Sequence, residues 1–118
     1  MMGPEAEYRA YLDAGRFMIQ RSRSTGRHVF YPRIAIPGTG ERDLEWVEAS
    51  GRGTVYAITV NRTREGSYNL ALIDLDEGPR MMSRVEGVET LPIGARVRAR
   101  IIDEDGKKLV VFDPESPA

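Results

Sequence analysis

The sequence predicts a mainly β protein with a short N-terminal helix, a small ribbon-like segment and a five-stranded barrel. Five runs rich in β-branched and aromatic residues predict the barrel, at residues 54–63, 68–75, 80–85, 96–103 and 107–112. Short connections rich in Gly, Pro, Asp and Ser separate most of these runs, which is typical of a small closed or nearly closed barrel. The length of 118 residues and the 41% hydrophobic content fit one folded domain with a core.

The fourth run has the cleanest period of two in the chain. Apolar and arginine side chains alternate over residues 96–101, and successive side chains of a strand point to opposite faces. We therefore expect Val97, Ala99 and Ile101 to face the barrel interior. The alternating arginines form either a solvated row paired with acids or a row that faces a ligand.

The helix is predicted over residues 4–15. Pro4 suits the first turn, Glu5 and Glu7 suit the positive end of the helix dipole, and Gly15 suits the C-terminal cap. An apolar stripe lies on one face at three- and four-residue spacing, formed by Tyr8, Tyr11 and Leu12. Because so short a helix is marginal alone, this stripe must pack on its own domain or on a partner.

The ribbon-like segment is predicted over residues 17–42. It contains two strand-like runs, residues 17–21 and 28–34, and two turns, at residues 24–26 and 37–40. A further short strand at residues 44–49 carries Trp46. We expect residues 1–42 to hold the helix and the ribbon, and residues 43–118 to form the barrel domain.

Composition excludes several kinds of chemistry. The chain has no cysteine and a single histidine, His28, which excludes disulfides, a thiol nucleophile, thiolate-held zinc and a histidine-cluster metal site. No apolar run approaches the ~20 residues that cross a bilayer, and the first residues do not resemble a secretory signal. We therefore expect a cytoplasmic protein. Fifteen of the seventeen basic residues are arginine, which reflects either codon bias or phosphate recognition.

The order of motifs resembles one family. The motifs are Gln20-Arg21, Tyr31-Pro32-Arg33, Trp46, residues 50–56 (SGRGTVY), residues 75–80 (LDEGPR), Ile93-Gly94 and Phe112-Asp113-Pro114. They resemble the OB-fold family that has an N-terminal rubredoxin-like zinc ribbon and is associated with acyl-CoA metabolism, long catalogued as a domain of unknown function. The resemblance covers roughly residues 8–114.

The resemblance also implies a zinc ribbon, but this chain has lost every ligand. The four positions that match the two Cys-x-x-Cys knuckles are occupied by Ser22, Thr25, Ile36 and Thr39. Zinc needs thiolate or imidazole donors, so we predict a ribbon without structural metal. Packing must then hold the segment, through Val29, Phe30, Tyr31, Ile34 and Ile36.

The family implies a non-catalytic accessory subunit of thiolase-like enzymes, including lipid-transfer-type thiolases and aldolases that act on acyl-CoA. In this chain the resemblance implies partner contacts at Tyr8, Tyr11 and Leu12. It implies CoA-phosphate contacts at Arg52 and Arg80. Gly51 and Gly53 flank Arg52 and suit the close approach of a phosphate. The sequence leaves open whether CoA touches this chain.

Three alternatives stay open at this stage. Tyr56, Tyr68 and the basic N-terminal segment could serve an OB-fold module that binds single-stranded nucleic acid, although a net charge of −1 argues against it. An independent enzyme would have to use acids such as Asp74, Asp76 and Glu77, which more often shape a turn. An apolar helix face and exposed tyrosines would also suit a homodimer.

Overall fold

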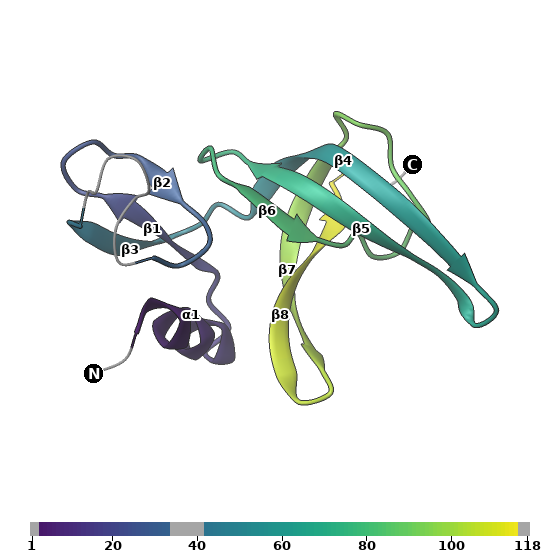
Figure 1. Ribbon diagram of the computed structural model, residues 1–118, viewed down its shortest axis with the longest axis horizontal. Helices are drawn as coiled ribbons and strands as arrows, with labels where there is room; N and C mark the ends of the chain where they lie inside the picture. Colours follow the sequence, from purple (N-terminus) through teal and green to yellow (C-terminus); the bar gives the residue numbers. More distant parts are fainter. Residues whose placement is uncertain (1–2, 34–41, 116–118) are drawn as a thin grey trace.

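The computed structural model describes residues 3–33 and 42–115, and it shows an N-terminal lobe beside a β-barrel (Figure 1). The N-terminal lobe contains helix α1 (Pro4–Asp13) and a three-stranded sheet of β1 (Met18–Ser22), β2 (His28–Val29) and β3 (Leu44–Glu48). The barrel contains β4 (Arg52–Thr63), β5 (Gly66–Leu75), β6 (Arg80–Ser83), β7 (Arg96–Glu104) and β8 (Lys107–Pro114). The predicted class, a mainly β chain with one N-terminal helix and a five-stranded barrel, is confirmed.

Antiparallel pairing builds the barrel sheet in the order β6-β5-β4-β7-β8. A parallel bridge between Val85 and Phe112 brings the chain after β6 against β8 and nearly closes the barrel. Val97 is fully buried while Arg96 and Arg98 are exposed, so the predicted alternation of β7 is confirmed. Asp105 and Gly106 both have positive φ in the β7–β8 turn, as a two-residue hairpin of the Asp-Gly type requires.

The N-terminal sheet has the order β2-β1-β3. In it β3 pairs along its whole length with β1, from Met18 opposite Glu48 to Ser22 opposite Leu44. The strand that carries Trp46 therefore lies in the small sheet, although the sequence prediction placed residues 43–49 with the barrel. The division of the chain into two domains stays a prediction. The second predicted ribbon strand is shorter than expected, because β2 contains only His28 and Val29.

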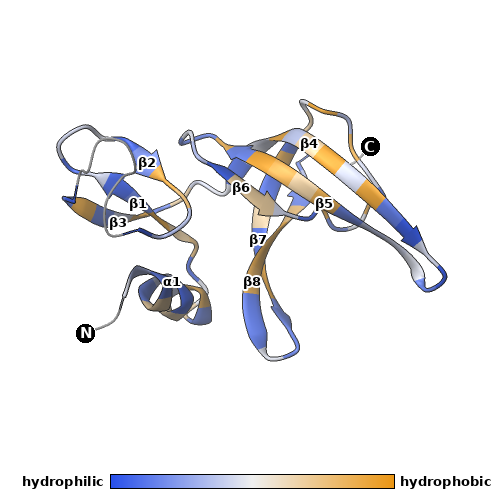
Figure 2. Ribbon diagram, viewed as in Figure 1, coloured by the Kyte–Doolittle hydropathy of each residue, from blue (hydrophilic) through white to orange (hydrophobic). Residues whose placement is uncertain are grey.

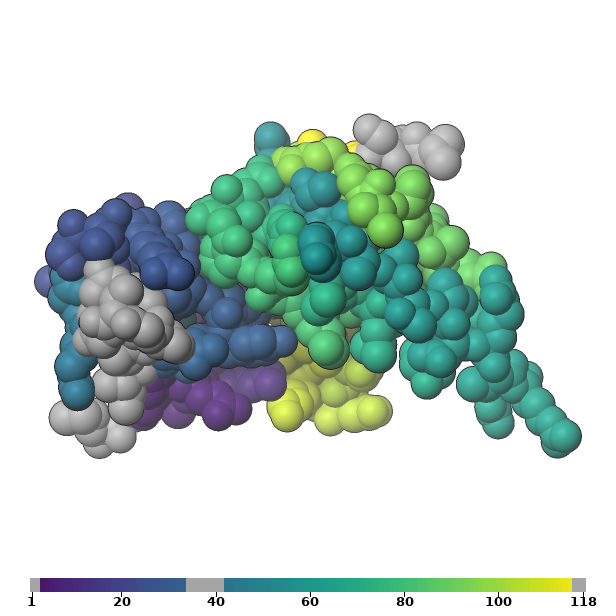
Figure 3. Space-filling view, turned by 45° about the horizontal axis from the view of Figure 1, so that its top comes forward, coloured from purple at the N-terminus to yellow at the C-terminus, as the bar shows by residue number. Residues whose placement is uncertain are grey.

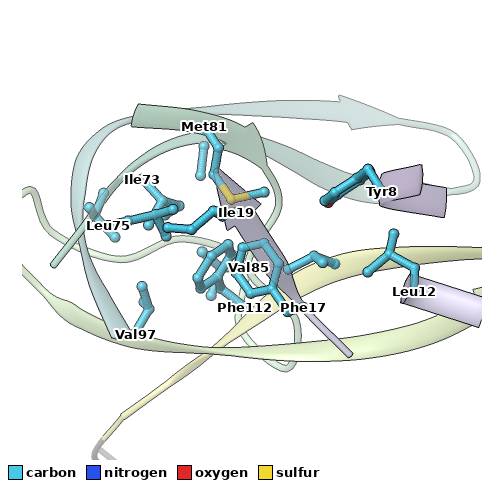
Figure 4. Packing of buried hydrophobic residues seen from close by; sticks show 13 residues of the cluster. Tyr8, Leu12, Phe17, Ile19, Ile73, Leu75, Met81, Val85, Val97 and Phe112 are labelled. Atoms are coloured by element: carbon cyan, nitrogen blue, oxygen red, sulfur yellow. The ribbon is translucent and has the colours of Figure 1, made fainter. Parts of the chain in front are cut away.

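One apolar core joins the lobe to the barrel. Tyr8 and Leu12 of α1 and Phe17 and Ile19 belong to the same buried cluster as barrel residues such as Phe112. Figure 4 shows Phe17 and Ile19 beside Val85 and Phe112. In Figure 2 apolar segments run along β4 and β5, while the hairpin tips are hydrophilic. A core that crosses the lobe boundary makes the two parts pack as one unit.

Candidate functional site

An apolar groove runs along the face where the N-terminal lobe meets the barrel. It consists of two cavities of about 330 and 530 Å³. Both cavities are lined by Tyr31, Met82, Leu109 and Val110. The first reaches under α1 to Tyr8, and the second continues along β5 to Tyr68 and Leu70. Figure 3 shows α1 and the β7–β8 hairpin side by side at the lower edge of this face.

Four large apolar side chains of the groove are exposed to solvent. The exposed fractions are 50% for Tyr31, 55% for Tyr68, 48% for Leu70 and 56% for Met82. Exposed apolar side chains that gather on one face, rather than scatter singly, mark interaction sites. The rim is polar, because Arg84 pairs with Glu104 (Nη2 to Oε1, 2.8 Å) beside the second cavity.

The Gln20 side chain holds the segment that carries Tyr31 in place over the groove. This side chain is buried, donates to the backbone oxygen of Arg33 at 2.7 Å, and accepts from the Arg33 backbone N–H at 2.6 Å. Gln20 thus gives the segment after β2 the two hydrogen bonds that a neighbouring strand would supply. Phe30 packs between Tyr8 and Tyr31, with ring centroids 5.4 and 4.8 Å away.

The structure places the helix residues that were expected to contact a partner largely against the protein's own core, and their role in partner contact stays a prediction. Leu12 is 1% exposed and Tyr8 is 9% exposed, because both belong to the protein's own core. Tyr11 is half-buried, with its ring 5.5 Å from that of Trp46. The indole N–H of Trp46 donates to Glu7 at 2.7 Å, which fixes the helix on the small sheet. The apolar stripe therefore packs inward, and the exposed apolar surface lies in the groove instead.

Tyr8 supplies a pH-dependent check on this packing. Burial raises the pKa of Tyr8 from 10.0 to about 12. The unfolded chain ionises this phenol at lower pH than the folded chain does. Its contribution of about 2–3 kcal/mol is therefore present below pH 10 and is lost as pH rises toward 12. The free energy of unfolding, measured in urea at a series of pH values, should therefore decline between pH 10 and 12 in the wild type. Tyr8→Phe should remove the part of this decline that Tyr8 causes, whereas Tyr11→Phe should retain it. If the free energy of unfolding falls with pH equally in the wild type and in Tyr8→Phe, the burial of Tyr8 is contradicted.

Two glycines of the predicted phosphate turn have structural tasks. A Cβ on Gly53 would lie 2.6 Å from Cγ2 of Ile73 and 2.9 Å from the Asp74 carbonyl oxygen, so only glycine lets β4 and β5 approach here. Gly51 is buried, has φ +78°, and accepts from the Ala99 N–H at 2.6 Å. A carboxylate already binds this turn, since the Ser50 N–H donates to Glu77 at 2.6 Å.

The two predicted phosphate arginines differ sharply. Arg80 forms two hydrogen bonds with Asp74 (2.6 and 3.3 Å) and lies 3.3 Å from the ring centroid of Tyr56. Its fork is therefore already engaged by a carboxylate. The exposed side chain of Arg52 forms no ion pair with any part of the chain that the structure describes. A role in CoA binding stays a prediction for both residues.

The acids that an enzyme would need are held in ion pairs and turns. Asp74 binds Arg80, and both oxygens of Asp76 accept from Arg96 at 2.8 Å. The hydrogen bond from Arg96 lowers the pKa of Asp76, which keeps this group ionised and unsuited to general acid catalysis. Glu77 binds the Ser50 backbone. These contacts give the acids of residues 74–77 a structural role, because each acid holds an arginine side chain or a turn in place on the barrel surface.

The tyrosines proposed for base stacking do not form one platform. Tyr68 lies opposite Asn61 in the β4–β5 register, whereas Tyr56 lies at the bulge between Val55 and Ala57. The positions are five residues apart along β4, about 16 Å at the rise of a strand. Arg80 covers the ring of Tyr56. Stacking of consecutive bases needs neighbouring rings, so this geometry gives the nucleic-acid alternative no support.

The first knuckle of the ribbon is held by a polar network. The Ser22 hydroxyl donates to Asp43 at 3.2 Å and accepts from the Thr25 N–H at 3.4 Å. The Ser24 N–H donates to the other oxygen of Asp43 at 2.8 Å. Hydrogen bonding by the Ser24 side chain is the main cause that lowers the pKa of Asp43, and the Ser24 N–H and the Ser22 hydroxyl lower it further. A carboxylate and a hydroxyl thus tie together the turn that follows β1.

These residues do not fit a structural zinc ion. Ser22 and Thr25 offer neutral hydroxyls, which are poor zinc donors. Across the described ranges, 3–33 and 42–115, no three His, Cys, Asp or Glu side chains gather as a metal site would require. The other two knuckle positions, Ile36 and Thr39, lie outside the described residues. A metal-free ribbon stays a prediction.

We expect chelation to leave the protein unchanged. Because hydrogen bonds and packing hold the first knuckle, EDTA should not shift the melting temperature, whereas chelators unfold small domains that depend on zinc. Asp43→Ala should lower the melting temperature by removing two hydrogen bonds, and Glu65→Ala, which removes an exposed acid from the β4–β5 turn, serves for comparison. One tightly held zinc per purified chain would contradict this prediction.

The architecture defines the class of protein. A nearly closed five-stranded barrel preceded by a helix and a three-stranded ribbon is an OB-fold with an N-terminal ribbon lobe. Residues 46–101 match the family model for the C-terminal OB-fold domain of ChsH2. The chain belongs to the DUF35 family of acyl-CoA-associated OB-fold proteins.

Three curated relatives are each 33% identical to the chain. A DUF35 domain-containing scaffold protein of Pyrococcus furiosus matches over 93 residues, 67% of this chain and 68% of the relative. The 3-oxo-4,17-pregnadiene-20-carboxyl-CoA hydratase alpha subunit of Mycobacterium tuberculosis matches over 79 residues, 61% of this chain. A probable enoyl-CoA hydratase alpha subunit of Thermomonospora curvata matches over 112 residues, 86% of this chain. The matches span only 25% and 34% of these two hydratase subunits.

Two solved structures share the fold. The chain is similar to the Ltp2-ChsH2(DUF35) aldolase, with a TM-score of 0.84, 27% identity and coverage of 98% of both chains. A DUF35 protein of unknown function from Sulfolobus solfataricus has a TM-score of 0.69 at 18% identity, covers 97% of this chain and 87% of its own, and shows the fold alone. No helix in the described part of the chain is long and apolar enough to span a bilayer.

Proposed function

We propose that this chain is a non-catalytic accessory subunit that docks on a thiolase-like enzyme of acyl-CoA metabolism. The observation that carries the proposal is its similarity along 98% of both chains to one chain of the Ltp2-ChsH2(DUF35) aldolase. The relatives named as a scaffold protein and as hydratase alpha subunits support the same setting. The partner we favour is a lipid-transfer-type thiolase or aldolase.

The distribution of polar groups supports an accessory role. The acids at residues 74–77 are bound by arginines or by the backbone, and the chain has no cysteine. Carbon–carbon bond chemistry on a thioester needs a nucleophile and a base placed within reach of each other. In this proposal the partner enzyme supplies both groups, and the present chain supplies a surface.

We place the docking surface on the apolar groove. Its four exposed side chains, Tyr31, Tyr68, Leu70 and Met82, form an apolar centre, and the Arg84–Glu104 pair forms part of a polar rim. An apolar centre inside a polar rim is the usual anatomy of a protein interface, and tyrosine often contributes most of the binding energy. In this proposal the groove, whose first cavity is also lined by Tyr8 and Leu12 of the helix stripe, is the surface that meets the enzyme.

Paired substitutions test this placement. We expect Leu70→Glu and Met82→Glu, separately and together, to weaken binding to the co-expressed enzyme by about a hundredfold or more, because each buries a charge against an apolar surface. Ile93→Glu is the matched control, since Ile93 is 74% exposed and lies outside the groove. The measurement is biolayer interferometry with purified enzyme.

Three controls distinguish enzyme binding through the groove from unfolding, from an effect of the added charge alone and from dimerisation. Each variant should melt at the temperature of the wild type, because the replaced side chains are about half exposed. Binding that is lost with Ile93→Glu and kept with the groove variants would overturn the placement. Sedimentation of the chain alone reports a homodimer. If the groove variants abolish dimers but leave enzyme binding intact, the groove joins copies of this chain and the placement is wrong.

A further inference from the structure

Two arginines face each other across β4 and β7 on the outer surface of the barrel. Arg52 lies opposite Arg98 in the antiparallel register, and both side chains are exposed. The next positions, Gly53 and Val97, are buried. Because residues directly opposite in an antiparallel pair point to the same face, the two guanidinium groups project on the same side.

The carboxylate oxygens of the two nearest acids are hydrogen-bonded to other arginines, although the charge of Arg52 also acts on Asp76 and helps to lower its pKa. Asp76 uses both oxygens on Arg96, at 2.8 Å each. Asp113, opposite Arg98 in the β7–β8 register, uses both oxygens on Arg100, at 2.7 and 3.0 Å. Neither Arg52 nor Arg98 has an ion pair or a side-chain hydrogen bond within residues 3–33 and 42–115.

The backbone keeps the two arginines opposite each other. Gly51 is buried with φ +78°, and an added Cβ would lie 3.5 Å from Cβ of Ala99. The Gly51 carbonyl accepts from the Ala99 N–H at 2.6 Å, one residue beyond the paired arginines. On the other side, the Asp76 N–H donates to the Arg52 carbonyl at 3.0 Å. These bonds fix the strand positions of Arg52 and Arg98, although like charges directly opposite in a sheet are unfavourable.

We infer that Arg52 and Arg98 form a binding site for a phosphate group. A phosphate offers several negative oxygens, and two planar guanidinium forks can bind it bidentately from neighbouring strands. The anion would also remove the repulsion between the two arginines. The site takes a phosphate monoester or a diphosphate, and the proposed function points to CoA as the source, since CoA carries both groups. Arg80, already bound to Asp74, is not part of this site.

Titration of the full-length protein tests the inference. The probes are inorganic phosphate, pyrophosphate, CoA and dephospho-CoA, observed by NMR chemical shifts at low salt. We expect saturable binding with the shifts centred on β4 and β7, and weaker binding as salt is added. Arg52→Gln and Arg98→Gln should each weaken binding about tenfold. Arg64→Gln, which removes the same charge from the exposed β4–β5 turn, should leave it unchanged.

The comparison between the probes shows which phosphate group of CoA the site binds. A stronger response to CoA than to dephospho-CoA assigns the 3′-phosphate, and equal responses with binding of pyrophosphate assign the diphosphate. No saturable binding by any probe, or equal weakening by Arg98→Gln and Arg64→Gln, would overturn the inference. Enzyme docking is measured separately with the groove variants. Loss of the phosphate site with docking intact, or the reverse, therefore shows which of the two proposals fails.

Discussion

Leu12→Ala should lower the free energy of unfolding by about 3–5 kcal/mol, the upper range for a leucine truncated in a core. Leu12 is 1% exposed and lies in the cluster that joins α1 to the barrel. Its removal leaves a cavity between parts of the chain that are far apart in sequence. Urea unfolding followed by far-UV circular dichroism and by Trp46 fluorescence measures the loss.

The same experiment tests whether the core is continuous. Trp46 reports on the N-terminal lobe, whereas circular dichroism mainly reports on the barrel strands. Because one cluster spans both parts, the two signals should change together in a single transition. Leu70→Ala is the matched control, since Leu70 is 48% exposed and should lose less than about 1 kcal/mol. Two separate transitions, or equal losses for both variants, would contradict the shared core.

Asn69→Ala should cost about 2–4 kcal/mol, because it leaves several buried backbone groups without partners. The Asn69 side chain is 5% exposed. It donates to the carbonyl oxygens of Val85 at 3.0 Å and Glu89 at 3.2 Å, and accepts from the Val85 N–H at 2.8 Å. These bonds hold β5 to the segment that closes the barrel against Phe112.

Hydrogen exchange separates this local effect from general destabilisation. In Asn69→Ala the Val85 amide loses its acceptor, so it should exchange faster than amides of the β7–β8 hairpin. Asn61→Ala is the control, because Asn61 lies on β4 opposite Tyr68, is only partly buried, and has no side-chain hydrogen bond to the described residues. Equal protection of Val85 in the two variants would show that Asn69 does not close the barrel.

Local patterns predicted the barrel strands well. The alternation over residues 96–101 predicted which side of β7 is buried, and the Asp-Gly turn at residue 105 predicted a hairpin. Long-range pairing was harder to predict. Nothing local to residues 44–48 distinguishes a partner in β1 from a partner in the barrel, so the pairing of β3 with β1 could not be predicted. The role of Gln20 also depends on a segment thirteen residues away.

The candidate site was less predictable than the fold, for a physical reason. The stripe of Tyr8, Tyr11 and Leu12 shows that one helix face must be covered, but periodicity does not say by what. The barrel covers Tyr8 and Leu12, and the small sheet packs against Tyr11. The groove combines side chains from β5, β6, β8 and the segment after β2, so only the assembled fold brings them together. The signal in the sequence was that residues 70–73 (LALI) and Met81-Met82 are apolar at consecutive positions, which places apolar side chains on both faces of these strands.

Native mass spectrometry of the chain co-expressed with thiolases and aldolases of its own organism tests the accessory role most directly. The account predicts a stable complex of defined stoichiometry with one of these acyl-CoA enzymes. It also predicts that the groove variants Leu70→Glu and Met82→Glu release the free chain. Turnover of acyl-CoA by the purified chain alone, or the absence of a complex with every such enzyme, would contradict it.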